Sequence, residues 1–231
     1  MVQLTRSGLT LSSQQALESL RAQFDRQHCI RLPGFLDSNL LSFVRGRLEE
    51  AEFAERAHDD IGVELCLKHD TALDLLYFIA NDQRLFGLVQ QLTGCDRIGC
   101  FLGRIYRMAP GSGHYDSWHG DTINHRLIGM SVNLGARKYA GGLFQLRERR
   151  SPNIVCEVAN TGSGDAILFR IASDLVHRVT SVEGTTPKTA FAGWFHSEPE
   201  FLSLFANGAR RSVEQEQTTD ENEIERSGRS R

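Results

Sequence analysis

The stretch from Arg126 to Leu134, Arg-Leu-Ile-Gly-Met-Ser-Val-Asn-Leu, decides the fold class because its apolar residues recur at every second position. Successive side chains of a strand point to opposite faces, so this is the period of a strand rather than of a helix. One face carries Ile128, Met130, Val132 and Leu134, and the other carries Gly129, Ser131 and Asn133. The pattern predicts a strand with one face packed in a core and the other free to line a cavity.

Further runs of strand length lie on both sides of this stretch. They are Cys100 to Arg107, Leu143 to Leu146, Ile154 to Val158, Ala166 to Phe169, His177 to Val182 and Lys188 to Phe195. The segments between the later runs contain turn residues, such as Gly141-Gly142 and Ser151-Pro152-Asn153, and no crossover helix. An antiparallel barrel or jelly roll is therefore favoured over a sheet of βαβ units.

Helical patterns dominate residues 1–95. Ser12-Ser13-Gln14-Gln15 offers a capping box for one helix, Asp37 and Asp82 can cap two more, and Gly94 ends the last. Cys29-Ile30-Arg31-Leu32 is typical of a short strand. We expect an all-β core with flanking helices (α+β), as one domain over residues 1–208 with helical support in 1–95 and the jelly-roll core in 96–208. Residues 209–231 are polar and without periodicity, which predicts a disordered tail.

The composition is that of an ordinary globular protein of 231 residues, with 40% hydrophobic and 24% charged residues. Lys and Arg total 26 against 29 for Asp and Glu, so the net charge of −3 does not favour a nucleic-acid partner. No secretory signal or membrane-spanning stretch is evident, so we expect no membrane partner and a cytoplasmic location. The five cysteines form no Cys-x-x-Cys pair, and most are expected to be reduced and buried.

A candidate metal site is formed by His119, Asp121 and His177. Residues two apart on a strand share a face, so His119 and Asp121 can bind one ion, with His177 contributed from a position 58 residues later. Two imidazoles and one carboxylate are the facial set of non-haem Fe(II) sites, although Zn²⁺ accepts the same ligands in hydrolases. His114 and Asp116 make a second His-x-Asp pair. We prefer His119, which adjoins Trp118 and leads into the 126–134 strand, and the alternative stays open.

These residues stand within an ordered series of motifs. The series is Tyr106, His119-Gly120-Asp121, Tyr139-Ala140-Gly141-Gly142-Leu143-Phe144, Gly164-Asp165-Ala166-Ile167-Leu168-Phe169, His177-Arg178-Val179, Lys188 and Trp194. It resembles the Fe(II)- and 2-oxoglutarate-dependent dioxygenases, in particular their prolyl-4-hydroxylase-like branch, over roughly residues 97 to 197. The helical half resembles the support helices of that family only loosely. The resemblance implies a double-stranded β-helix of the jelly-roll, cupin-like type, and a metal site of His119, Asp121 and His177.

The resemblance also implies a cation for the distal carboxylate of 2-oxoglutarate, placed on a strand after the second histidine. Lys188 is the candidate, and Tyr106 or Thr180 could add hydrogen bonds. Arg178 is a competitor, but its neighbour His177 would point to the cavity, so Arg178 would point away from it. Arg104 shares a face with Tyr106 and is a possible contact for substrate or cosubstrate. Taken alone, Lys188 would be read as a solvated turn lysine.

The reaction implied is oxidative decarboxylation of 2-oxoglutarate to succinate coupled to hydroxylation of a C–H bond, with Fe(II), 2-oxoglutarate and O2, and ascorbate as a supporting reductant. Related halogenases replace the carboxylate ligand by a small residue, so the presence of Asp121 favours hydroxylation, with desaturation or ring closure left open. We expect a small-molecule or peptide-biosynthesis substrate. The alternatives are a protein side-chain (prolyl-type) hydroxylase and a metal-binding jelly roll without oxygenase activity.

Overall fold

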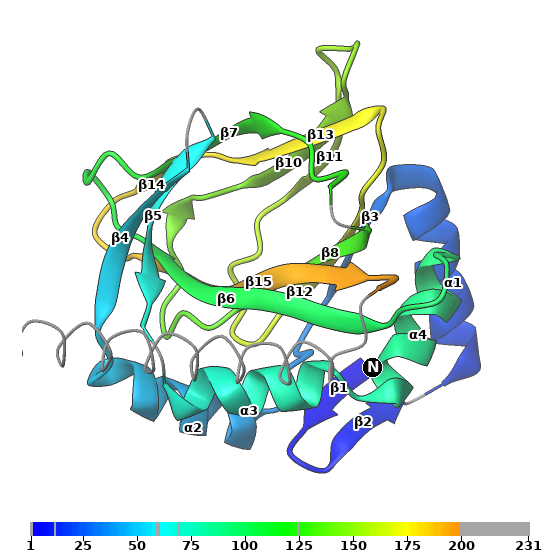
Figure 1. Ribbon diagram of the computed structural model, residues 1–231, viewed down its shortest axis with the longest axis horizontal. Coiled ribbons are helices and arrows are strands. Elements are labelled where there is room, and N and C mark those ends of the chain that lie inside the picture. Colours follow the sequence, from blue (N-terminus) through cyan, green and yellow to red (C-terminus); the bar gives the residue numbers. More distant parts are fainter. Residues whose placement is uncertain (1, 12, 59–60, 69, 124, 199–231) are drawn as a thin grey trace, which may run out of the picture.

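The computed structural model describes residues 2–11, 13–58, 61–68, 70–123 and 125–198. Its centre is an antiparallel sheet that curls into a nearly closed barrel, with helices along its outer side (Figure 1). The antiparallel jelly roll expected from the sequence is confirmed. The disordered tail predicted for residues 209–231 lies outside the described residues, as do residues 199–208 of the expected domain.

Two walls make up the barrel. One contains β6 (Cys100–Met108), β15 (Lys188–His196), β8 (Arg126–Asn133), β12 (Ala166–Arg170) and β3 (Cys29–Leu32), in that order. The other contains β5 (Gly62–Leu67), β7 (Tyr115–His119), β13 (Leu175–Val179), β10 (Phe144–Glu148) and β11 (Ile154–Val158), and β4 (Phe53–His58) pairs with β5. Strand β5 joins the walls because it pairs with both β6 and β7. A further short pair, β9 (Ala140–Gly141) with β14 (Val182–Glu183), lies beside them.

The 126–134 stretch behaves as its period predicts. In β8, Ile128, Met130 and Val132 are buried in the main hydrophobic cluster that the strands share with the helices. On the opposite face Ser131 lines a cavity inside the barrel. Strand β8 pairs with β12 on one side and β15 on the other, so it is a central strand of its wall.

In the part of the chain that the structure describes, four helices cover the first wall: α1 (Gln14–Gln27), α2 (Ser38–Glu49), α3 (Thr71–Ala80) and α4 (Gln83–Thr93). Their ends follow the expected capping chemistry. The Ser13 hydroxyl accepts from Ala16 N, the Asp37 carboxylate accepts from Asn39 N at 2.6 Å, and Gly94 ends α4 with a positive φ of 65°. The helices therefore form where local sequence favours them, and bury their apolar faces against the barrel.

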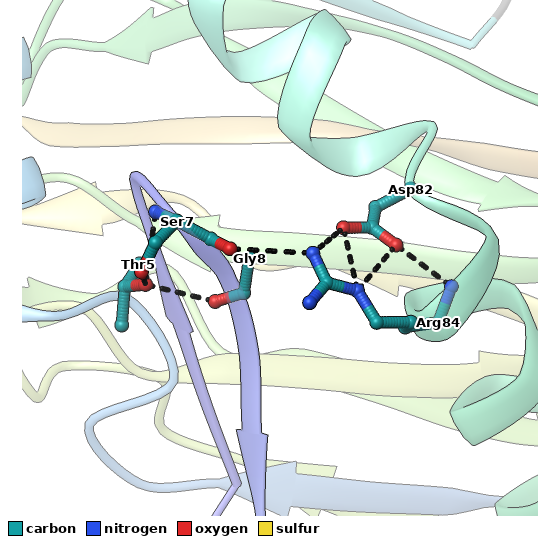
Figure 2. Close-up of polar contacts among 5 residues, drawn as sticks. All are labelled: Thr5, Ser7, Gly8, Asp82 and Arg84. Atoms are coloured by element: carbon teal, nitrogen blue, oxygen red, sulfur yellow. Dashed lines mark hydrogen bonds and ion pairs between the residues drawn. The ribbon is translucent and has the colours of Figure 1, made fainter.

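The first half also contains hairpins that the sequence reading did not predict. Strands β1 (Val2–Thr5) and β2 (Gly8–Leu11) form one, which is fastened to the start of α4 by Arg84 (Figure 2). Arg84 Nη2 donates to the Ser7 carbonyl at 3.2 Å and to Asp82 Oδ2 at 2.6 Å. The second hairpin, β4–β5, matters more for function, because β5 brings Glu64 to the cavity.

All five cysteines are free thiols in the structure. Cys29, Cys100 and Cys156 are buried, and the other two are half-buried, as the sequence led us to expect for most of them. None of the described helices has the length and apolar character needed to cross a membrane.

Candidate metal centre and cavity

His119 and His177 lie opposite each other on the adjacent antiparallel strands β7 and β13. Their ring centroids are 4.3 Å apart. Asp121 follows two residues after the end of β7, and ligand atoms from the three side chains all lie within 4.8 Å of one another. The structure thus brings together the three residues that the sequence analysis singled out for a metal.

Both histidines are set up to present a lone pair. His119 Nδ1 lies 2.8 Å from the Ser117 carbonyl oxygen, which can only accept, so Nδ1 carries the proton and Nε2 is left free. His177 is buried, and this burial together with the nearby His119 lowers its pKa to about 3. Neutral imidazole is the form that binds metal ions, so His177 needs no deprotonation at neutral pH.

Asp121 completes a donor set that fits a divalent metal. Its side chain is buried, and both of its carboxylate oxygens have partners: Arg126 Nη1 donates to Oδ1 at 2.9 Å and Trp194 Nε1 donates to Oδ2 at 2.6 Å. Hydrogen bonds to a carboxylate favour its charged form, which is the form that binds a cation. Two imidazoles and one oriented carboxylate suit Fe(II), as they would suit Zn²⁺.

The competing His-x-Asp pair does not form a comparable group. His114 Nδ1 accepts a hydrogen bond from Ala109 N at 3.0 Å, which holds the buried ring within the β6–β7 connection. Asp116 does line the cavity, and its Oδ1 is 3.3 Å from His119 Nδ1. Burial raises the pKa of Asp116 to about 6. Asp116 therefore faces His119 rather than acting with His114.

The metal-binding group opens into a cavity of about 700 Å³ inside the barrel. Lys188 also lines it and is 4% exposed, with Nζ donating to the Gly142 carbonyl at 3.2 Å. The rings of Tyr106 and Tyr139 lie about 6 Å from this ammonium. Burial lowers the pKa of Lys188 to about 8, against the opposing influence of Asp116 and Glu64. Lys188 is thus a buried cation of the cavity rather than a solvated turn residue.

The remaining predicted residues are placed differently from one another. Tyr106 lines the cavity, and burial raises its pKa, so its hydroxyl stays protonated. Thr180 follows the end of β13, where its hydroxyl oxygen accepts from Leu143 N at 2.9 Å, and it is not part of the cavity lining. Arg178 donates to Gln145 Oε1 and lies over the Trp118 ring, away from the cavity, as its position beside His177 predicts.

Glu64 and Asn160 line the cavity, and neither was identified as a site residue from the sequence. Arg104 lines the cavity as expected, but its Nε donates to Glu64, a partner that comes from β5. Asn160, which is 3% exposed, also lines the cavity, and its Oδ1 has no hydrogen-bond partner among the described residues. The alternation in Gly62-Val63-Glu64-Leu65 was a usable strand signal, whereas Asn160 stands in an irregular segment without one.

Residues 103–196 match the family model of the 2OG-Fe(II) oxygenase superfamily. This segment belongs to that superfamily. The matched range begins in β6 and ends in β15, and so includes all three metal-ligand candidates and Lys188. Like its family, the oxygenase is an oxidoreductase that uses Fe(II), 2-oxoglutarate and O2.

Solved structures share the fold of this oxygenase at low sequence identity. An oxidoreductase of the 2OG-Fe(II) oxygenase family from Burkholderia pseudomallei aligns with 17% identity and a TM-score of 0.58, over 86% of this chain and 97% of that one. A Pseudomonas putida prolyl-4-hydroxylase aligns with 15% identity and a TM-score of 0.55, over 79% and 100%. The α-ketoglutarate-dependent epimerase SnoN from nogalamycin biosynthesis has 15% identity and a TM-score of 0.57, over 80% and 82%. No curated protein matches the sequence.

Proposed function

We propose that this oxygenase hydroxylates a C–H bond of a small-molecule or peptide-biosynthesis substrate, with Fe(II) held by His119, Asp121 and His177. The observation that carries the proposal is that this group and the buried Lys188 open into the same cavity. When bound, Fe(II) and 2-oxoglutarate supply O2-dependent oxidation of the substrate, with decarboxylation of 2-oxoglutarate to succinate. The residues of the chain position and shield that chemistry.

Lys188 is proposed to hold the distal carboxylate of 2-oxoglutarate. In the cavity its ammonium donates to the neutral Gly142 carbonyl, so the distal carboxylate would supply an anionic partner in direct contact. The protonated Tyr106 hydroxyl lines the same cavity and can donate a further hydrogen bond. We leave Thr180 out of this assignment, because its hydroxyl is bound to the backbone outside the cavity lining.

The residues around the cavity favour a substrate with an apolar body. Ile61, Tyr115 and Ile123 line it while remaining 38%, 43% and 59% exposed, so they lie where the cavity meets solvent. Exposed apolar side chains at a cavity mouth are typical of a ligand-binding rim. Arg104, paired with Glu64, offers a polar contact within this apolar surface.

A protein side-chain hydroxylase of the prolyl type is the second candidate. The fold relatives support either substrate class, since one is a prolyl hydroxylase in complex with a hypoxia-inducible-factor peptide and another is SnoN in complex with Fe3+, α-ketoglutarate and nogalamycin RO. A zinc hydrolase or a metal-binding protein without oxygenase activity would have no use for the buried Lys188. Substrate profiling would separate the first two, and cosubstrate binding excludes the others.

The test is succinate formation by protein loaded with Fe(II), 2-oxoglutarate and ascorbate, in the presence of candidate substrates. His119→Ala should abolish both metal binding and succinate formation, whereas His114→Ala, from the competing pair, should retain both. Lys188→Met should weaken 2-oxoglutarate binding strongly, with exposed Lys138→Met as its control. Failure of the metal-loaded wild-type protein to bind 2-oxoglutarate would overturn the proposal.

A further inference from the structure

Asp121 differs from the two histidines in how the fold supports it. His119 and His177 belong to strands β7 and β13 and are paired with each other in the ladder. Asp121 lies beyond the end of β7, in a segment without regular secondary structure. Backbone pairing therefore orients the histidines, but it does not orient the carboxylate, which needs another means of support.

That support comes from two side chains of the first wall. Arg126 opens β8 and donates to Asp121 Oδ1, while Trp194, near the end of β15, donates to Oδ2. The two donors also hold each other, because the Arg126 guanidinium carbon lies 3.6 Å from the centroid of the Trp194 ring. Such close stacking is the geometry of a cation–π contact. Each carboxylate oxygen thus has its own fixed donor.

Asp121 is buried and its two donors are partly buried, which strengthens the contacts and makes their loss costly. The side chain of Arg126 is 15% exposed and that of Asp121 is 8% exposed. The Arg126 guanidinium forms its ion pair with Asp121 through Nη1, and its buried Nε has no hydrogen-bond partner among the described residues.

We propose that Arg126 and Trp194 are positioning residues that clamp Asp121 toward the two histidines and so preorganise the metal site. The inference rests on the proposed function, because it takes Asp121 to be a metal ligand. It adds that strand β15 supplies two parts of the site. Trp194 holds the metal carboxylate, and Lys188, six residues earlier on the same face, holds the cosubstrate. The rigid strand then fixes the separation between the metal and the far end of the keto acid.

The experiment measures Co(II) binding to the metal-free protein by calorimetry, with Co(II) as an air-stable substitute for Fe(II). Trp194→Phe keeps the ring and its stacking on Arg126 but removes the N–H donor. We expect its Co(II) affinity to fall about 10-fold, as is typical when the outer partner of a metal ligand is removed. Arg126→Lys keeps the charge but removes the planar guanidinium that stacks on Trp194, and should also weaken Co(II) binding at least threefold.

Trp118→Phe is the matched control. Trp118 also lies beneath two arginines, Arg147 at 4.5 Å and Arg178 at 4.7 Å, but it has no contact with Asp121 in the structure. Its Co(II) affinity should stay within twofold of wild type. The visible spectrum of bound Co(II) should change in Trp194→Phe and not in Trp118→Phe, because only the former removes a hydrogen bond to the Asp121 carboxylate. A purely structural role for Trp194 would leave this spectrum unchanged.

The outcomes separate this inference from the proposed function. If wild-type protein binds no Co(II), or His119→Ala binds it equally well, the metal site itself is refuted. If wild type binds Co(II) and both Trp194→Phe and Arg126→Lys stay within threefold of it, the clamp alone is refuted. Should Trp194→Phe fail to fold, Arg126→Lys carries the test, with its melting temperature compared with that of wild type.

Discussion

Glu64 on β5 and Arg104 on β6 form an ion pair in the wall of the cavity, where the two walls of the barrel meet. The Arg104 guanidinium also lies 5.6 Å from the ring centroids of both Tyr106 and Trp194. The pair therefore connects the strand junction with the residues proposed to hold the metal carboxylate and the cosubstrate.

Removing Glu64 should destabilise the protein markedly. Glu64→Ala leaves a largely buried guanidinium without its charge partner, which typically costs about 3 kcal/mol or more of unfolding free energy. Urea denaturation of the metal-free variant measures this loss. Glu52→Ala is the control, since Glu52 pairs with Lys68 at 2.9 Å but both side chains are exposed, so this variant should change the free energy of unfolding little. If both variants lost the same free energy of unfolding, burial would not be the reason for the large effect of Glu64→Ala.

Lys188 should make stability rise with pH in the alkaline range. Its pKa is lowered from 10.5 to about 8 in the native state, so between these values the unfolded chain binds more protons. The cost of burying the charged form is fully present below about pH 8 and is relieved as the pH rises toward 10.5. Lys188→Met should therefore stabilise the metal-free protein near neutral pH, by up to about 3 kcal/mol, and less at high pH.

The measurement is urea unfolding of wild type, Lys188→Met and the exposed control Lys138→Met across this pH range. If the difference in unfolding free energy between wild type and Lys188→Met does not shrink with rising pH, Lys188 is not a charged, buried group. Addition of 2-oxoglutarate should reverse the effect, because a carboxylate partner favours the protonated amine. Cosubstrate affinity should accordingly fall above about pH 8.

Gly129 should not tolerate a side chain, because the Phe169 ring occupies the space beside it. A Cβ at Gly129 would lie 2.0 Å from the ring, which itself packs against His177 with centroids 4.7 Å apart. Gly129→Ala should cost about 1–3 kcal/mol of unfolding free energy through overpacking. Gly46→Ala in α2 is the matched control, since its Cβ would meet nothing within 4 Å and alanine favours helix by about 0.5–1 kcal/mol. Urea midpoints should move in opposite directions.

Asp165 should contribute to stability without being part of the metal site. Its buried carboxylate accepts from Gly34 N at 2.8 Å and from Arg31 Nε at 2.9 Å, and so ties the β12 start to the end of β3. Asp165→Ala should lower the free energy of unfolding by about 2–3 kcal/mol, because hydrogen bonds to a charged group are lost. Asp25→Ala, which removes an exposed partner 3.9 Å from Arg170, should change it little. If the folded Asp165→Ala variant binds Co(II) more weakly than wild type, Asp165 does contribute to the metal site and the prediction is wrong.

The sequence was most informative where a pattern repeated over many residues. The spacing of Lys188 and Trp194 in β15 indicated two side chains that line the cavity. In β8 the alternation predicted Ser131 of the polar face in the lining, but Met130 of the apolar face also reaches the cavity. The triad of His119, Asp121 and His177 could be read from residue type and family resemblance, and the structure brings these side chains together. Local chemistry also sufficed for the helix caps, where a single side chain bonds to its own backbone neighbourhood.

The sequence was less informative where contacts depend on the tertiary fold. Strands β1 and β2 have four residues each, which is too short for a clear period, and Glu64 acquires its partner only when β5 meets β6. Thr180 stands an odd number of residues after His177 and beyond the end of β13, so strand alternation argued against the cavity face that the resemblance suggested. No sequence pattern identified Arg126 as a partner of the metal carboxylate, because the contact forms only when Asp121 folds back beside β8.

Strand β15 is the last strand in the described sequence, yet it lies between β6 and β8 in the middle of a wall. During synthesis, the edges of β6 and β8 that pair with β15 therefore stay unpaired with it until His196 has left the ribosome tunnel. Neither Lys188 nor Trp194 can reach the cavity before that insertion. The polypeptide consequently gains its central hydrogen bonds and the complete cavity together, in a late step that links contacts far apart in sequence and should make folding slow.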